Sequence, residues 1–175
     1  MIPNDVHGCG NSMEFYDMLI RELPSGSSLV EVGVFYGRGL VYLAQNSNFD
    51  IWGVDQFIHA AMPYHLPGVS NDLEFYQNCR RNLNENGASR VSLVPFASEM
   101  AALQFSNRSL DCVFLDAAHD YDSVKADIAA WRTKVKPGGY LAGDDYIDPW
   151  LGVIDAVTEA FPEHNVTGQT WWVRL

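Results

Sequence analysis

The chain has 175 residues, of which 22 are acidic and 11 are basic, giving a formal net charge of −11 at pH 7. This excess of negative charge argues against nucleic acid or an anionic membrane as a partner, and it favours a small neutral or cationic ligand. The length fits one domain, residues 1–175, that can bury a core without disulfides or metal ions. A homodimer is compatible with this composition.

The N-terminal residues and the cysteines favour the cytoplasm. The first residues contain no basic segment followed by an apolar one, and no apolar run approaches membrane-spanning length. The three cysteines, Cys9, Cys79 and Cys112, are odd in number, widely spaced and outside any Cys-x-x-Cys pair. We therefore expect reduced thiols and a cytoplasmic protein.

Apolar spacing predicts helices and strands in alternation. A helix that opens with a capping box of Asn11 and Glu14 and ends at Pro24 precedes a buried strand at residues 29–32, followed by a glycine turn and a helix. Further strands are predicted at residues 50–55, 91–95, 110–116 and 140–143, and further helices at 72–86, after 96–99, at 121–135 and at 150–161. Residues 164–175 predict an antiparallel hairpin around Gly168.

This alternation predicts an α/β fold: a doubly wound, Rossmann-like, mostly parallel seven-stranded sheet with a C-terminal antiparallel hairpin. Residues 57–70 follow neither the helix period nor the strand period, which predicts a long loop. Such a loop near a ligand site is a candidate lid or specificity segment. His59 and His65 within it either contact the substrate or are simply solvated.

The glycine turn at Gly33, Gly37 and Gly39 is the first candidate site. Glycine lets a backbone approach a ligand closely, and the following helix directs unpaired N–H groups into the same space. The spacing lacks the Gly-x-Gly-x-x-Gly run of dinucleotide binders, and Glu31 beside the turn suits a cationic group such as an amine. The alternative is a glycine turn that holds no ligand.

Asp55 follows the second strand, 22 residues beyond Gly33. In open α/β folds, a carboxylate at about this place accepts hydrogen bonds from ribose hydroxyls. The alternative is a helix cap or a solvated loop acid. Asp55 therefore extends the candidate ligand site to the end of the second strand.

Three further acids follow neighbouring strands of the predicted sheet. Asp116 ends the fourth strand, and Asp144 and Asp145 follow the fifth. Carboxylates that stand side by side repel one another unless a cation neutralises them, and an oxygen-rich site suits Mg²⁺ or Ca²⁺. The sequence therefore predicts a divalent-metal site at these strand ends.

These motifs carry a family resemblance. Glu31-x-Gly33-x-x-x-Gly37 resembles the first motif of class I S-adenosylmethionine-dependent methyltransferases, and residues 30–37 look like their small-molecule O-methyltransferase branch. Residues 115–121 and 136–146 resemble metal-dependent O-methyltransferases that act on catechols, caffeoyl-CoA and macrolide or aminocoumarin sugars. The resemblance implies metal-dependent methyl transfer from S-adenosylmethionine to a hydroxyl of a small polyhydroxylated acceptor, a catechol or a sugar.

The same resemblance implies the residues of the site. The metal would lie on Asp116, Asp144 and Asp145. Cofactor contacts are expected at Glu31, Gly33, Phe35, Gly37, Asp55, Gln56, Ser98, Glu99 and Asp116. Ala97-Ser98-Glu99 resembles the Ala-Ser-Gln that flanks the adenine in catechol O-methyltransferases, although Ser98 could equally be a helix N-cap.

The chain departs from its relatives at one position. Similar sugar-modifying enzymes tend to read Asp-Gly-Asp-His where this chain has Asp116-Ala117-Ala118-His119. The acid that serves as the base in those enzymes is therefore missing from this chain. His119 takes the place of the catalytic lysine of the catechol branch, and we expect His119 to act as general base beside Asp116. The alternatives for His119 are a residue that orients a metal ligand or a loop residue that caps the next helix.

Two other functions remain open. Ala118 leaves room for a metal-independent enzyme that uses S-adenosylmethionine. The shortness of the chain, which lacks the extra N-terminal helices of many relatives, leaves room for a non-catalytic S-adenosylmethionine-binding module.

Overall fold

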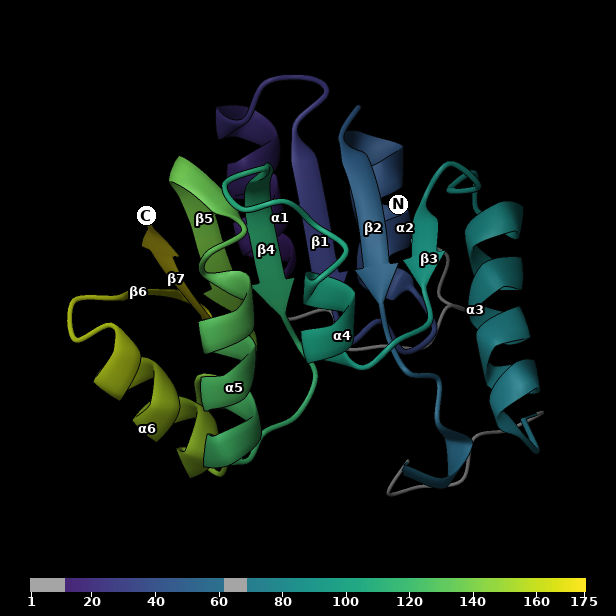
Figure 1. Cartoon of the computed structure of the whole chain (residues 1–175). Coiled ribbons are helices and arrows are strands. Elements are labelled where there is room, and N and C mark those ends of the chain that lie inside the picture. The colour runs from purple at the N-terminus through teal and green to yellow at the C-terminus, as the bar shows by residue number, and fades with distance from the viewer. Residues whose placement is uncertain (1–11, 62–68) are drawn as a thin grey trace.

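The computed structural model describes residues 12–61 and 69–175, and within them it forms a seven-stranded sheet with helices on both faces (Figure 1). The strands are β1 Ser28–Val32, β2 Asp50–Val54, β3 Ser92–Val94, β4 Leu110–Leu115, β5 Val135–Gly143, β6 Asn165–Thr167 and β7 Thr170–Arg174. The helices are α1 Met13–Glu22, α2 Arg38–Asn46, the 3₁₀ turn η1 His59–Ala61, α3 Asp72–Glu85, α4 Ser98–Ala102, α5 Tyr121–Trp131 and α6 Leu151–Ala160.

The strand order is β3-β2-β1-β4-β5-β7-β6. Strands β1 to β5 pair in parallel, and β7 runs antiparallel to both of its neighbours. The predicted fold class, a mostly parallel doubly wound sheet with a C-terminal antiparallel hairpin, is therefore confirmed for the described residues. No helix in those residues has the length and apolar character needed to cross a membrane.

Two apolar layers hold the helices to the sheet. Helices α1, α2 and α3 bury residues such as Phe15, Leu40 and Phe75 against one face, and α4, α5 and α6 bury Ile128 and Val157 among others against the opposite face. Figure 1 shows α4, α5 and α6 in front of the sheet. The strands alternate between these layers because successive side chains of a strand point to opposite faces.

The strand order reverses between β1 and β4, and this reversal opens a crevice at their carboxyl ends. The Asp116 amide donates to the Val32 carbonyl at 2.7 Å, and the Gly33 amide donates to the Val54 carbonyl at 2.8 Å. The ends of β1, β2 and β4 are therefore tied together directly beside the glycine turn.

Gly33 is required by this close approach. Its φ is +87°, and a Cβ built on it would lie 1.8 Å from the backbone carbonyl oxygen of Asp116. No rotamer change relieves a clash with backbone. The first glycine of the motif therefore forms a turn and also allows the ends of β1 and β4 to approach each other closely.

One predicted element was wrong at its end. The helix predicted to reach residue 135 ends at Trp131, and Val135 instead begins β5. Val135 pairs with Leu110, and the pairing resumes only at Tyr140 with Cys112. The residues between them form a bulge, where proline and glycine are tolerated because no regular ladder requires their N–H groups.

Some predicted residues lie outside the described part of the chain, namely Cys9, Asn11 and His65. The N-cap of α1 is Ser12, and its side chain makes no capping hydrogen bond. The described start of the predicted loop contains η1, which begins at His59.

Gly33→Ala should lower the free energy of unfolding by at least about 4 kcal/mol, the range reached when buried backbone is forced apart. The matched control is Gly87→Ala, because Gly87 has a φ of +72° and nothing within 4 Å of a built Cβ. That control should show only left-handed strain, about 1–2 kcal/mol. Urea denaturation of both variants measures the difference, and equal losses would contradict the close approach at Gly33.

Candidate active site

A pocket lies at the carboxyl ends of β4 and β5 and is lined by Asp116, His119, Asp127, Asp144 and Asp145 together with apolar side chains. Asp116 directly follows β4, and the Asp144-Asp145 pair directly follows β5. Because these parallel strands are neighbours, their carboxyl ends bring the acids together as the sequence predicts.

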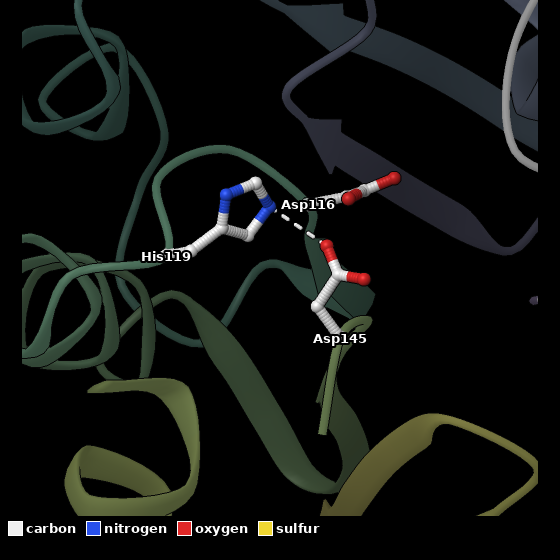
Figure 2. A group of neighbouring side chains, drawn as sticks. All are labelled: Asp116, His119 and Asp145. Atoms are coloured by element: carbon white, nitrogen blue, oxygen red, sulfur yellow. Dashed lines mark ion pairs between the residues drawn. The ribbon is translucent and has the colours of Figure 1, made fainter. Parts of the chain in front are cut away.

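Three of these side chains, Asp116, His119 and Asp145, form one compact group (Figure 2). One oxygen or nitrogen atom of each lies within 4.8 Å of those of the other two. His119 Nε2 lies 2.7 Å from Asp145 Oδ2. Asp145 has a φ of 61°, an uncommon backbone conformation for a non-glycine residue, and such strain is often found at functional sites.

Asp144, the third predicted metal ligand, is engaged elsewhere. Its carboxylate is buried and accepts a hydrogen bond from Ser12 Oγ at 2.8 Å and a longer one from Thr170 Oγ1 at 3.5 Å. The structure therefore brings together two of the three predicted ligands and places His119 with them. Asp144 lines the same pocket, and its hydrogen bonds tie Ser12, before α1, and Thr170, at the start of β7, to the site.

Glu31 lies inside the core on the α1 side of the sheet. Tyr16 shares a side-chain hydrogen bond with its carboxylate, whereas Oε2 has no hydrogen-bond partner among the described residues. Gly39 gives Glu31 its room, because a Cβ there would lie 2.7 Å from Oε1. An unpaired buried oxygen is costly, so Glu31 is suited to a ligand that brings a donor or a positive charge.

Asp55 anchors the glycine loop. Its Oδ2 accepts hydrogen bonds from the Val34 and Phe35 amides at 2.9 and 3.0 Å, and its Oδ1 accepts one from the Phe57 amide at 2.8 Å. Within the chain Asp55 is therefore a partly buried anchor of the loop backbone, which differs from the alternative of a helix cap or a solvated loop acid. A carboxylate offers about four acceptor positions, so these three bonds leave capacity for a ligand hydroxyl.

Phe35, Gly37 and Gln56 line the same region in different ways. Phe35 is half-buried, and the centroid of its ring lies 4.3 Å from that of the Tyr36 ring. Gln56 is exposed. Gly37 is the N-cap of α2 in a left-handed conformation, and a Cβ on it would meet Cys79 at 3.3 Å. The left-handed conformation, which residues with a side chain rarely adopt, therefore accounts for glycine at position 37 without a ligand.

Ser98 is neither free nor an N-cap. Ala97 is the N-cap of α4, and Ser98 Oγ accepts a hydrogen bond from Trp131 Nε1 at 2.8 Å. Ser98 also hydrogen-bonds to Asp127, a buried acid of α5 whose pKa is raised to about 6, chiefly by burial. Asp127 is not among the site residues predicted from the sequence, although an acid among the apolar positions of a helix is a visible signal. Glu99 is exposed in the first turn of α4.

The acids of this region raise one another's pKa values. Burial, followed by the charges of Asp144 and Asp145, raises the pKa of Asp116 to about 8. Burial, followed by Asp116 and Asp144, raises the pKa of Glu31 well above its ordinary value. The hydrogen bond to Asp145 raises the pKa of His119, although burial opposes this shift. The site thus favours bound protons or other cations.

Comparison with known families agrees with this geometry. A family model described as a methyltransferase domain matches residues 30–146, more than half of the chain. The chain belongs to this family. The match begins at the glycine motif and ends just after Asp145, so both predicted motifs lie inside it. The predicted methyltransferase is therefore confirmed at the level of the family.

A curated relative is also similar. Uncharacterized protein R132 of Acanthamoeba polyphaga mimivirus is 26% identical over 121 residues, which cover 68% of this chain and 51% of the relative. This methyltransferase chain thus spans about half the length of that relative.

Solved structures share the fold. Cofactor-bound Rv0187 from MTB has a TM-score of 0.69 at 15% identity, with 99% of this chain and 83% of that chain covered. CalS11, a TDP-rhamnose 3′-O-methyltransferase of calicheamicin biosynthesis, has a TM-score of 0.65 at 19% identity, covering 93% and 77%. A SAM-dependent O-methyltransferase from Thermotoga maritima has a TM-score of 0.63 at 18% identity, covering 91% and 52%. At these identities the similarity establishes the fold alone.

The raised pKa of Asp116 makes stability depend on pH. Its folded pKa of about 8 exceeds the unfolded value near 3.9, so between these values the folded state binds more protons than the unfolded state. Without added cations, the free energy of unfolding should therefore fall as pH rises through this window. Asp116→Asn should remove this contribution and flatten the slope.

Asp120→Asn is the matched control for this experiment. Asp120 is exposed and caps α5, and its pKa is lowered, chiefly by the Ser123 amide that donates to it. Its carboxylate therefore stays ionised between about pH 5 and 8, and its replacement should leave the slope unchanged in that range. Urea midpoints across the range measure both variants, and identical slopes for wild type and Asp116→Asn would contradict the electrostatic account.

Proposed function

We propose that the protein transfers a methyl group from S-adenosylmethionine to a hydroxyl of a small polyhydroxylated acceptor, a catechol or a sugar, at a divalent-metal site. The observation that carries this proposal is the group of Asp116, His119 and Asp145, with ligand atoms within 4.8 Å of one another, in a chain of a methyltransferase family. The group lies where open α/β sheets bind their ligands.

The glycine turn and the acids around it are suited to the cofactor. Glu31, with its unpaired buried oxygen, would receive the positively charged amino group, and Gly33 would lie under the amino acid end. Asp55 would accept a ribose hydroxyl with its remaining capacity while it holds the loop. Contacts from Phe35, Gly37, Gln56, Ser98, Glu99 and Asp116 remain predictions for the rest of the cofactor.

The donor atoms are suited to a divalent metal, and they favour Mn²⁺ over the predicted Mg²⁺ or Ca²⁺. Carboxylates suit Mg²⁺, Ca²⁺ and Mn²⁺, an imidazole nitrogen suits first-row transition metals, and Mn²⁺ belongs to both groups. Asp116, Asp145 and His119 would hold the ion, with Asp144 as a further negative charge in the same pocket. When bound, such an ion lowers the pKa of a coordinated hydroxyl.

The residues around the group favour the reaction electrostatically. Leu115, Val153 and Trp171 line the pocket beside the acids and give it an apolar wall. In the transfer, a bond forms between the acceptor oxygen and the methyl carbon, the carbon–sulfur bond breaks, and opposite charges disappear. A dry site that fixes both reactants favours such a step.

The proposed acceptor has hydroxyls on adjacent carbons, because neighbouring oxygens can approach one metal together. The sugar alternative gains support from CalS11, which shares the fold and whose reaction is methylation of a TDP-rhamnose. The catechol alternative rests on the resemblance of Ala97-Ser98-Glu99 to the corresponding segment of catechol O-methyltransferases. A panel containing both kinds of diol distinguishes them.

Removal of divalent metal should abolish product formation from S-adenosylmethionine and the diol panel, and Mn²⁺ should restore it better than Mg²⁺. Affinity for S-adenosylhomocysteine, measured by calorimetry, should persist under chelation because Glu31, Gly33 and Asp55, which would hold most of the cofactor, are not among the metal donors. Turnover that survives exhaustive chelation would instead support the metal-independent enzyme. Cofactor binding without any product would support the non-catalytic module.

The role of His119 can be tested separately, because we propose it as a metal donor where the sequence predicted a general base. As a donor, His119→Ala should weaken Mn²⁺ binding by at least about 10–100-fold, and excess Mn²⁺ should restore part of the activity. A lost general base would lower the rate by about 10²–10⁴-fold with Mn²⁺ affinity unchanged. His59→Ala is the control, since His59 lies in η1 outside the group.

A further inference from the structure

Helix α6 is pressed against the segment that carries His119. A Cβ built on Gly152 in the first turn of α6 would lie 2.5 Å from the His119 carbonyl oxygen and 2.6 Å from the Tyr121 amide nitrogen. Only a residue without a side chain permits this approach, so Gly152 fixes the distance between the start of α6 and the His119 backbone.

Trp150, the N-cap of α6, follows from this placement. Its indole stacks on the His119 imidazole, with ring centroids 4.2 Å apart and an angle of 25° between the planes. The Trp150 amide donates to the Ile147 carbonyl at 2.8 Å, and the Trp150 carbonyl accepts from the Val153 amide at 3.0 Å. The backbone that carries the indole is therefore fixed on both sides.

His119 is thus held from two directions. Asp145 fixes the Nε2 edge of its ring at 2.7 Å, and Trp150 covers one face of the ring. The His119 side chain remains 34% exposed, so burial alone would not fix its rotamer. The stacked indole restricts rotation of the imidazole and keeps Nε2 directed toward Asp145 and Asp116.

We propose that Trp150 is a positioning residue for the metal site. It orients His119 so that the imidazole nitrogen joins the carboxylates of Asp116 and Asp145 as a donor. This inference rests on the proposed function in one respect, that His119 is a donor to the metal. Residues behind metal ligands typically contribute 10–100-fold in metal affinity.

The test uses the full chain with Trp150→Ala, Trp150→Phe and the matched control Leu151→Ala, which removes the neighbouring exposed side chain of α6. In proton NMR of the metal-free protein, the indole ring current should displace the imidazole C–H resonances of His119, assigned by their loss in His119→Gln. Trp150→Ala should abolish the displacement. Trp150→Phe should retain part of it, and Leu151→Ala should leave it unchanged.

The second readout is Mn²⁺ affinity, measured by calorimetry without cofactor or acceptor. Trp150→Ala should bind Mn²⁺ about 10–100-fold more weakly than wild type, with Trp150→Phe and Leu151→Ala close to wild type. If wild type binds Mn²⁺ and Trp150→Ala binds it equally well, the inference is overturned and the metal site stands. If wild type binds no Mn²⁺, the metal site falls and the inference with it.

A kinetic outcome would also overturn the inference. If Trp150→Ala raises the KM for the acceptor while Mn²⁺ affinity stays unchanged, Trp150 contacts the acceptor and does not position His119. A loss of kcat that follows metal occupancy and is restored in Trp150→Phe supports positioning.

Discussion

The carboxyl edge of the sheet gathers carboxyl groups whose pKa values are raised by burial and by one another's charge. Glu31 and Asp144 are themselves buried. Burial, followed by the charge of Glu31, raises the pKa of Tyr16, and burial, followed by the charge of Asp144, raises the pKa of Asp116. Hydrogen bonds from Tyr16, Ser12 and Thr170 offset only part of this repulsion. In the proposed reaction, the positive cofactor and the metal ion would supply the balancing charge, so the occupants of the site and the stability of the fold are linked.

The sequence predicted the framework of this edge because local patterns encode it. Apolar runs mark β1, β2 and β4, and each is followed by an acid or a glycine that a sheet places at its carboxyl edge. Side-chain directions are not local. Asp144 turns toward Ser12, 132 residues away along the chain, and no spacing rule connects that pair.

The missed boundary at Val135 has a comparable cause. Lys136-Pro137-Gly138-Gly139 indicates a stop, and the chain does leave the regular ladder there, but it has already paired Val135 with Leu110. The pairing of Val135 is a long-range interaction. It is hidden in the sequence because the apolar residues at 124–135 follow the helix period. Ser98 shows the same limit. Its hydroxyl accepts a hydrogen bond from Trp131, 33 residues later in the chain, and does not cap its own helix.

Asp145 places a carboxylate beside His119, although Ala118 stands where similar enzymes have an acid. Similar sugar-modifying enzymes carry an acid within the segment that here reads Asp116-Ala117-Ala118-His119. In this chain Asp145, held at a φ of 61°, brings a carboxylate to 2.7 Å from the His119 imidazole from the neighbouring strand. The carboxylate next to the histidine therefore belongs to a residue just after β5, and its backbone is held there in an uncommon conformation.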